Sequence, residues 1–223
     1  MSAVSPGTTP ATGRHGFWYE HFAAEAERLW RDGTPWPLDP TISLRRSARP
    51  PFQQEFGPEL ELGMDKARDL LITGVTRNTL VNSNYNKFEA WLRNGCRIRM
   101  LLIDPSSDAI DVASERYYAE RSPDSARERV RHTLRLLAEL KRATDGDLSV
   151  RLTSYPLAMG VICVDGGLDR RSSASALFAE YYTYQALGEP KFVLQPGESP
   201  WFSNLYQEAE ALWGIAPEHN LVR

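Results

Sequence analysis

The sequence predicts an α/β fold in which a mixed or parallel β-sheet is flanked by helices. Short apolar runs, typical of strands buried on both faces, alternate with longer segments whose apolar residues recur at helical spacing. Met159–Val164 is the clearest such strand, because it contains valine, isoleucine and cysteine and no charged residue. A chain of 223 residues that is 42% hydrophobic is long enough to form one sizeable α/β core.

Three segments are expected along the chain. Residues 1–15 are rich in serine, proline, glycine and threonine, which predicts a disordered tail. Residues 16–55 contain an amphipathic pattern that predicts an extra N-terminal helix, followed by a proline-rich connector that excludes a long helix. Residues 56–223 are expected to form the α/β domain.

Helices and strands are expected to alternate in the first half of this domain. A helix over Pro58–Asp69 is followed by a strand over Asp69–Val75, a helix over Asn84–Asn94 and a strand over Arg97–Asp104. This order is typical of parallel strands joined by right-handed crossovers. Gly95 is expected to end the second helix in a left-handed conformation.

The second half of the domain begins with the longest predicted helix. Ser122 supplies an N-cap and Pro123 the first helical residue, and the helix is expected to run to about Thr144 and end at Gly146. The segment before it, Ser106 to Arg121, is expected to be partly helical. The later elements are a strand over Leu148–Leu152, the strand Met159–Val164, a segment over Ala174–Tyr182 that fits a strand or a helix, a strand over Lys191–Leu194 and a helix over Pro200–Trp213.

Composition argues against several classes of protein. A net charge of −3 does not favour a general nucleic-acid-binding surface. No apolar run approaches the roughly 20 residues of a membrane span and no signal peptide is visible, so a cytoplasmic location is expected. Cys96 and Cys163 lie in or beside apolar runs and are expected to be buried, reduced thiols. They belong to no metal-binding pattern, and we expect no metal or cofactor.

Four segments resemble the phospholipase D-like family, in order between Phe56 and Trp213. They are KARDLLITGV, FEAWLRNGCRIRMLLID, LSVRLTSYPLAMGVICVDGG and WFSNLYQEAEALW. In this family the third segment carries a histidine, a lysine two residues later and an aspartate five residues after that. Here Asp165 stands at the aspartate position, while Ala158 stands at the histidine position and Gly160 at the lysine position.

The resemblance implies a catalytically degenerate member of that family. The family's reaction uses one imidazole to attack a phosphodiester and a second to protonate the leaving oxygen, while the lysine neutralises phosphate oxygens. Ala158 cannot act as a nucleophile and Gly160 carries no charge, so standard phosphodiesterase activity is not expected. The family builds its site from two signature motifs and this chain contains one, which implies a homodimer. The two small residues are expected to open a volume for a small-molecule ligand.

The candidate site residues follow strand ends or the degenerate motif. Asp165 is expected to bind a ligand hydroxyl or amine, or alternatively to cap the turn at Gly166. Tyr155 is expected to flank the pocket or to pack in the core. The ligand-binding candidates are Arg77 and Asn78 after the first strand, Ala158 and Gly160 in the motif, Ser172 and Ser173 in the loop that follows it, and Tyr182 in a tyrosine-rich patch.

Three functions are compatible with these residues. The leading prediction is a catalytically degenerate phospholipase D-like domain that binds a small ligand, phosphorylated or nucleotide-like, in a regulatory or defence role. The first alternative is an enzyme with altered chemistry in the same pocket, in which Asp165 acts with Tyr155 or a serine. The second alternative is a protein–protein interaction module that uses the Trp18–Trp30 helix and the tyrosine patch.

Overall fold

The structure of the protein, a computed structural model, describes residues 52–116, 122–167, 175–196 and 200–222. The predicted tail, the predicted N-terminal helix and the candidate residues Ser172 and Ser173 lie outside the described residues. The strands are β1 (Asp69–Gly74), β2 (Arg97–Ile103), β3 (Leu148–Thr153), β4 (Met159–Val164), β5 (Ala176–Tyr181), β6 (Lys191–Leu194) and β7 (Glu218–His219). The helices are α2 (Pro58–Lys66), α3 (Asn78–Ser83), α4 (Tyr85–Arg93), α5 (Ala109–Glu115), α6 (Pro123–Thr144) and α7 (Trp201–Ile215).

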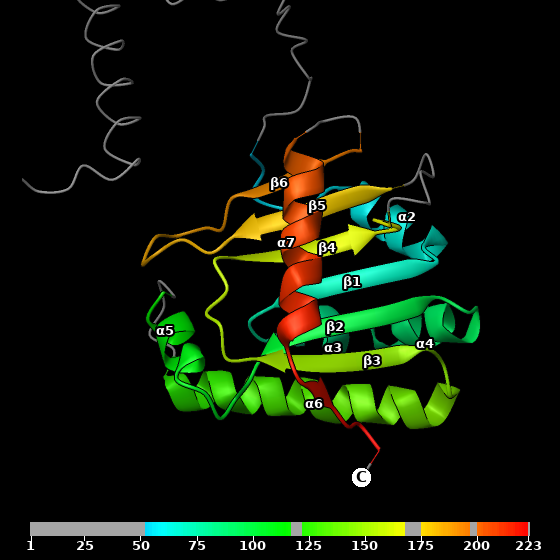
Figure 1. The fold of residues 1–223 in the computed structure, drawn as a ribbon, viewed down its shortest axis with the longest axis horizontal. Coiled ribbons are helices and arrows are strands. Elements are labelled where there is room, and N and C mark those ends of the chain that lie inside the picture. Colours follow the sequence, from blue (N-terminus) through cyan, green and yellow to red (C-terminus); the bar gives the residue numbers. More distant parts are fainter. Residues whose placement is uncertain (1–51, 117–121, 168–174, 197–199, 223) are drawn as a thin grey trace, which may run out of the picture. The chain divides into compact units, whose positions relative to one another are not determined.

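The described strands form one seven-stranded mixed sheet in the order β6-β5-β4-β1-β2-β3-β7 (Figure 1). Strands β1, β2 and β3 are parallel, as the alternation of helices and strands predicts. Strand β4 is antiparallel to β1, with Thr73 paired to Val161 and Leu70 paired to Val164. Strand β5 is in turn antiparallel to β4. The predicted mixed α/β sheet flanked by helices is therefore confirmed.

The strand directions define two ends of the sheet. Strands β1, β2, β3 and β5 finish at one end, where β4 begins; we call this the C-terminal edge. Strand β4 finishes at the opposite end, where the three parallel strands begin; we call this the N-terminal edge. Residues at the two ends of β4 are thus separated by the full length of the strand.

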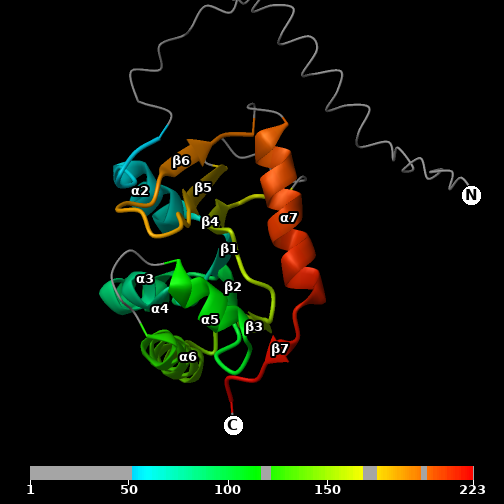
Figure 2. The same ribbon diagram turned by 90° about the vertical axis from the view of Figure 1, so that its left-hand side faces the viewer.

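Helices cover both faces of the sheet (Figure 2). Helices α2, α3, α4 and α6 cover one face and share a large core with the sheet, which includes Leu70, Ile98 and Phe88. Helix α7 crosses the opposite face, where Phe202 and Tyr206 pack on a smaller cluster. Within the described part of the chain, no helix combines the length and apolarity needed to span a bilayer.

Local signals in the sequence account for several element ends. The Ser122 hydroxyl accepts a hydrogen bond from the Ser125 amide at 3.2 Å, which caps α6 as predicted. Gly95, at a φ of 81°, ends α4 in the left-handed region as predicted. Helix α6 ends at Thr144 as predicted, but the residue that terminates it is Asp145, in the left-handed conformation at a φ of 49°, and not the expected Gly146. The ambiguous segment 174–182 contains a strand, β5.

The sequence did not predict helix α3. Its residues, NTLVNS, are rich in asparagine and serine, which favour turns over helix interiors. Burial of Val81 in the core holds this short helix in place. The two cysteines are free and buried, as predicted, and burial raises the pKa of Cys96 to about 12.

Candidate functional site

Three polar side chains meet at the C-terminal edge, above the backbone of Gly160. Arg77 comes from the turn after β1, Glu180 from the end of β5, and Tyr182 from the residue that follows that strand. A Cβ atom added to Gly160 would collide with Arg77 Nη2 and Tyr182 Oη and would lie 2.8 Å from Glu180 Oε1. We call Arg77, Glu180 and Tyr182 the Arg77 cluster.

The backbone after β1 directs the Arg77 side chain over the sheet. Arg77 lies in the left-handed region, at a φ of 47°, and its Nε donates a hydrogen bond to the Thr73 carbonyl at 2.8 Å. The side chain crosses Gly74, where a Cβ atom would collide with it. Its Nη1 donates to the Glu180 carboxylate. Gly74 and Gly160 therefore both provide the room that the guanidinium occupies.

The ion pair between Arg77 and Glu180 is largely removed from solvent. The two side chains are 8% and 15% exposed. Burial alone would lower the pKa of Arg77, but its electrostatic interactions with Tyr182 and Glu180 outweigh this effect and raise the pKa above its ordinary value. The guanidinium therefore stays charged, and a partly desolvated arginine is well suited to bind a carboxylate or a phosphate.

The cluster offers a cation and hydrogen-bonding groups, and among the described residues no histidine contributes to it. The described residues include two histidines, His132 on α6 and His219 on β7, on elements that contribute nothing to the cluster. The nearest groups to Gly160 are a guanidinium, a phenol and a carboxylate. Among the described residues there is also no set of histidine, cysteine, aspartate and glutamate side chains that could hold a metal ion.

The expectation that Ala158 and Gly160 leave an open volume is wrong at Gly160. The side chains of the Arg77 cluster fill that space, because Arg77 reaches across from β1. Ala158 is exposed at the C-terminal edge, and its carbonyl accepts a hydrogen bond from the Tyr182 amide at 3.1 Å. The sequence alone predicts an open space beside Gly160, but the pairing of β1, β4 and β5 places the side chains of the Arg77 cluster in it.

The remaining sequence-predicted residues of this edge are placed differently. Tyr155 follows β3 and is 62% exposed, so it lies at the surface of the edge and not in the core. Asn78 follows Arg77 but turns away, since its Nδ2 lies 3.4 Å from Thr133 Oγ1 and 3.5 Å from the Arg129 carbonyl on α6. The structure thus brings together Arg77, Gly160 and Tyr182 and leaves Asn78 outside the cluster.

Asp165 lies at the N-terminal edge, away from the Arg77 cluster. Asp165 is five residues beyond Gly160 along and just past β4, and at about 3.3 Å per residue this separates it from the cluster by about 17 Å. The expected shared site of Asp165 with Arg77 or Tyr155 therefore does not form, because β4 runs antiparallel to the strands that carry them. The general tendency of ligands to bind where parallel strands end favours the opposite edge.

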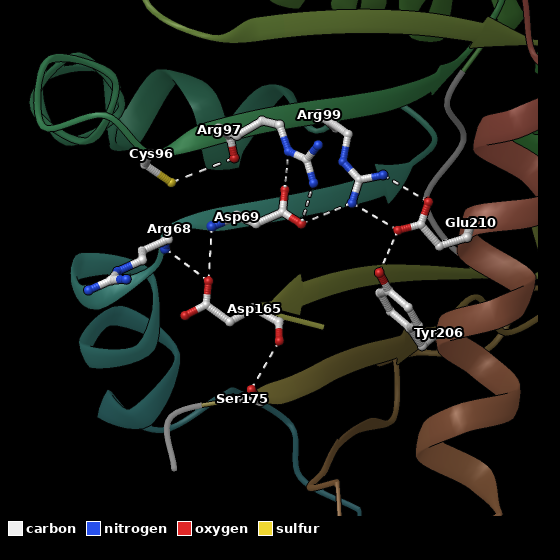
Figure 3. A network of polar contacts seen from close by, with 9 residues as sticks. All are labelled: Arg68, Asp69, Cys96, Arg97, Arg99, Asp165, Ser175, Tyr206 and Glu210. Atoms are coloured by element: carbon white, nitrogen blue, oxygen red, sulfur yellow. Dashed lines mark hydrogen bonds and ion pairs between the residues drawn. The ribbon is translucent and has the colours of Figure 1, made fainter. Parts of the chain in front are cut away.

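Asp165 instead fastens the start of β1 to the end of β4 (Figure 3). Its Oδ1 accepts hydrogen bonds from the amides of Arg68 and Asp69, both at 2.9 Å. Its backbone is left-handed, at a φ of 46°, and its carbonyl accepts from the Ser175 hydroxyl at 3.0 Å. These hydrogen bonds join two strands, a role that differs from both sequence predictions, the ligand contact and the cap of the turn at Gly166.

Replacing Asp165 by alanine is expected to lower the free energy of unfolding by about 2–3 kcal/mol, because the buried amide of Asp69 and the partly buried amide of Arg68 lose their acceptor and alanine is strained in the left-handed region. Asp165→Asn keeps an acceptor oxygen and tolerates this backbone, so it is expected to cost about 1 kcal/mol or less. Urea denaturation measures both. Equal losses of unfolding free energy in Asp165→Ala and Asp165→Asn would contradict the role of Asp165 as the acceptor for these two amides.

A second polar network lies under α7 and was not predicted from the sequence (Figure 3). Asp69 accepts hydrogen bonds from Arg97 at 2.8 and 3.0 Å and from Arg99 at 3.1 Å. Arg99 also donates to both oxygens of Glu210 at 2.8 Å, and the Tyr206 hydroxyl donates to Glu210 at 2.6 Å. We call these five residues the Asp69 network. The sequence feature that indicates this network is the alternation of arginines in RIRMLLI, which places Arg97 and Arg99 on one face of β2.

The chain is similar to several solved structures, two of which are Nuc and TrmBL2. No protein-family model matches the chain, and no curated protein matches it. Nuc from Salmonella typhimurium, a phospholipase D family member, has a TM-score of 0.40 and 12% identity, over 71% of this chain and 87% of its own. TrmBL2, an archaeal chromatin protein whose structure shows a novel mode of DNA binding, has a TM-score of 0.44 and 10% identity, over 91% of this chain and 67% of its own. At this level of identity, the chemistry of the site rests on its own residues.

Proposed function

We propose that this chain is a catalytically silent α/β domain that binds a small anionic ligand, such as a phosphate ester, at the Arg77 cluster. The observation that carries the proposal is the buried, charged guanidinium of Arg77 at the C-terminal edge. Interactions with a guanidinium strengthen when it is withdrawn from water, and its planar fork matches phosphate oxygens. The absence of a histidine among the described groups of the cluster favours binding over turnover, as expected for a degenerate phospholipase D-like domain.

Exposed tyrosines at the same edge favour a nucleotide-like ligand. Tyr155 follows β3 and Tyr181 ends β5, and Tyr184 lies in the connection that follows. Their exposed fractions are 62%, 46% and 67%. Aromatic faces at a sheet edge can stack on a flat ring while a cation holds the phosphate. A regulatory or defence role remains the accompanying prediction.

The β5–β6 connection supports a second candidate function. Leu187 is 84% exposed there, beside the exposed Tyr184. Contiguous exposed apolar patches are typical of contacts with a partner chain. The protein–protein interaction module, and the homodimer implied by the family resemblance, would use these exposed side chains as part of such a patch.

Calorimetric titration with adenosine 5′-monophosphate tests the leading proposal. Wild type is expected to bind, and Arg77→Lys is expected to weaken binding by about tenfold or more, because lysine lacks the planar fork. Arg135→Lys, on the exposed face of α6, is the matched control and is expected to leave the affinity unchanged. Neither wild type nor Arg77→Lys is expected to hydrolyse bis(4-nitrophenyl) phosphate.

Two results would contradict the proposal. One is an affinity that Arg77→Lys leaves unchanged, which would place the bound nucleotide elsewhere. The other is phosphodiester hydrolysis that Arg77→Lys abolishes, which would make the cluster an active site. A wild-type protein that binds no phosphate ester would leave the interaction module as the surviving candidate.

A further inference from the structure

The Arg77 cluster already contains an anion of its own. Glu180 provides the countercharge of Arg77, and the two side chains are 8% and 15% exposed. The Tyr182 hydroxyl lies 3.5 Å from Glu180 Oε1. An incoming anion that binds Nη1 of the guanidinium therefore takes the place of the Glu180 carboxylate.

Displacement by a simple anion leaves an unbalanced charge. The released Glu180 would remain near the sheet without its cation and beside the newly bound anion, and separating a buried ion pair is costly for this reason. Glu189, in the β5–β6 connection, also acts electrostatically on Arg77 and adds a second negative charge nearby. Lys191 lies across from Glu180 in the register of β5 and β6, but its ammonium group pairs with Glu55 at 3.1 Å.

We infer that the ligand of the Arg77 cluster is a small zwitterion, whose anionic group replaces Glu180 on Arg77 and whose ammonium group pairs with the released Glu180 carboxylate. This inference rests on the proposed function and names the charge pattern of its ligand. Such a molecule satisfies both members of the ion pair, so no charge is left unbalanced. Glu180 is then the residue that decides specificity, because it weakens, without abolishing, the binding of anions that carry no cation, adenosine 5′-monophosphate included.

The rearrangement requires only side-chain motion. Glu180 lies at the penultimate position of β5, paired with Gly160 across the strand, and its backbone is fixed by the sheet. Rotation of its side chain opens the guanidinium, while the Thr73 carbonyl still holds Arg77 Nε. A ligand with two carbons between its anionic group and its ammonium group is long enough to contact the Arg77 guanidinium and the Glu180 carboxylate together.

Two phosphonates that differ by one group test the inference. 2-Aminoethylphosphonate carries an ammonium group, ethylphosphonate lacks it, and neither can be hydrolysed as an ester. Calorimetry is expected to show that wild type binds 2-aminoethylphosphonate about tenfold more tightly than ethylphosphonate. Glu180→Gln, which keeps the shape and removes the charge, is expected to abolish this preference and to bind ethylphosphonate more tightly than wild type does.

Two further variants separate the inference from the proposed function. Glu218→Gln, at an exposed carboxylate on β7, makes the same change in net charge and is expected to keep the preference. Arg77→Lys is expected to weaken both phosphonates. Equal affinities of wild type for the two phosphonates, or a preference that survives in Glu180→Gln, would overturn the inference of a zwitterionic ligand. Weaker binding of both phosphonates by Arg77→Lys would in that case still support an anion site at the Arg77 cluster. A folded wild type and a folded Glu180→Gln that bind neither phosphonate would overturn both.

Discussion

Replacing Asp69 by asparagine is expected to lower the free energy of unfolding by about 3 kcal/mol. Asp69 is 5% exposed and its carboxylate accepts hydrogen bonds from two arginines. Asparagine would leave the buried Arg99 with Glu210 as its remaining anionic partner in the Asp69 network. The Nε of Arg99 already has no hydrogen-bond partner among the residues that the structure describes. Urea denaturation followed by tryptophan fluorescence measures the loss.

Arg97→Gln is the matched control for this prediction. The Arg97 side chain is 47% exposed, so water screens its ion pair with Asp69. Its removal is expected to cost less than about 1 kcal/mol. An Asp69→Asn loss no larger than that of Arg97→Gln would show that the network does not hold α7 to the sheet.

Acid is expected to remove the stabilisation that the ionised Asp69 carboxylate gives to the fold. Burial alone would raise the pKa of Asp69, but hydrogen bonds and charges from Arg97 and Arg99 outweigh it and hold the pKa below its ordinary value. A depressed pKa stabilises the fold above the pKa of the unfolded carboxyl, about 3.9. That contribution is lost as the pH falls through the folded pKa. The difference between wild type and Asp69→Asn should therefore narrow below about pH 4 and be constant between pH 6 and 7.

The substitution Gly160→Val is expected to lower the free energy of unfolding by about 3–5 kcal/mol and to abolish phosphonate binding. Its Cβ would collide with Arg77 Nη2 and Tyr182 Oη, although valine is otherwise favourable in a strand. The buried ion pair between Arg77 and Glu180 must then separate or move out of the sheet. Urea denaturation measures the first effect and calorimetry the second.

Gly63→Ala provides the control for Gly160→Val. Gly63 lies inside α2, and an added Cβ would meet the Val164 side chain at 3.7 Å, an ordinary contact. This variant is expected to be neutral or to stabilise the protein by up to about 1 kcal/mol. A Gly160→Val protein as stable as Gly63→Ala would contradict the packing of the Arg77 cluster.

Much of the fold could be predicted because its signals are local. The apolar run Met159–Val164 defines β4 residue for residue, and Ser122 with Pro123 defines the start of α6. The direction of β4 depends on which strand it pairs with, and hydrophobicity along the chain carries no information on that pairing. Asp165 was therefore expected near the ligand, whereas antiparallel pairing places it at the opposite edge.

The candidate site could be predicted only in part, for a related reason. Arg77, Gly160 and Tyr182 were each candidates, but their meeting depends on the register of three strands. Glu180 was seen only as part of the tyrosine patch, because nothing in its local sequence marks it as the partner of Arg77. An arginine in a loop is usually exposed, and a left-handed backbone that turns it inward has no reliable signature outside glycine and asparagine.

The most direct test of the Arg77 cluster is a nuclear magnetic resonance titration that follows arginine Nε–Hε signals as 2-aminoethylphosphonate is added. The Arg77 signal is identified by its absence in Arg77→Lys, and its hydrogen bond to the Thr73 carbonyl slows its exchange with water. We expect a saturable shift of the Arg77 signal while that of Arg99, in the Asp69 network, stays in place. A shift confined to Arg99, or an Arg77 signal that does not change as the ligand is added in excess, would contradict binding at the Arg77 cluster.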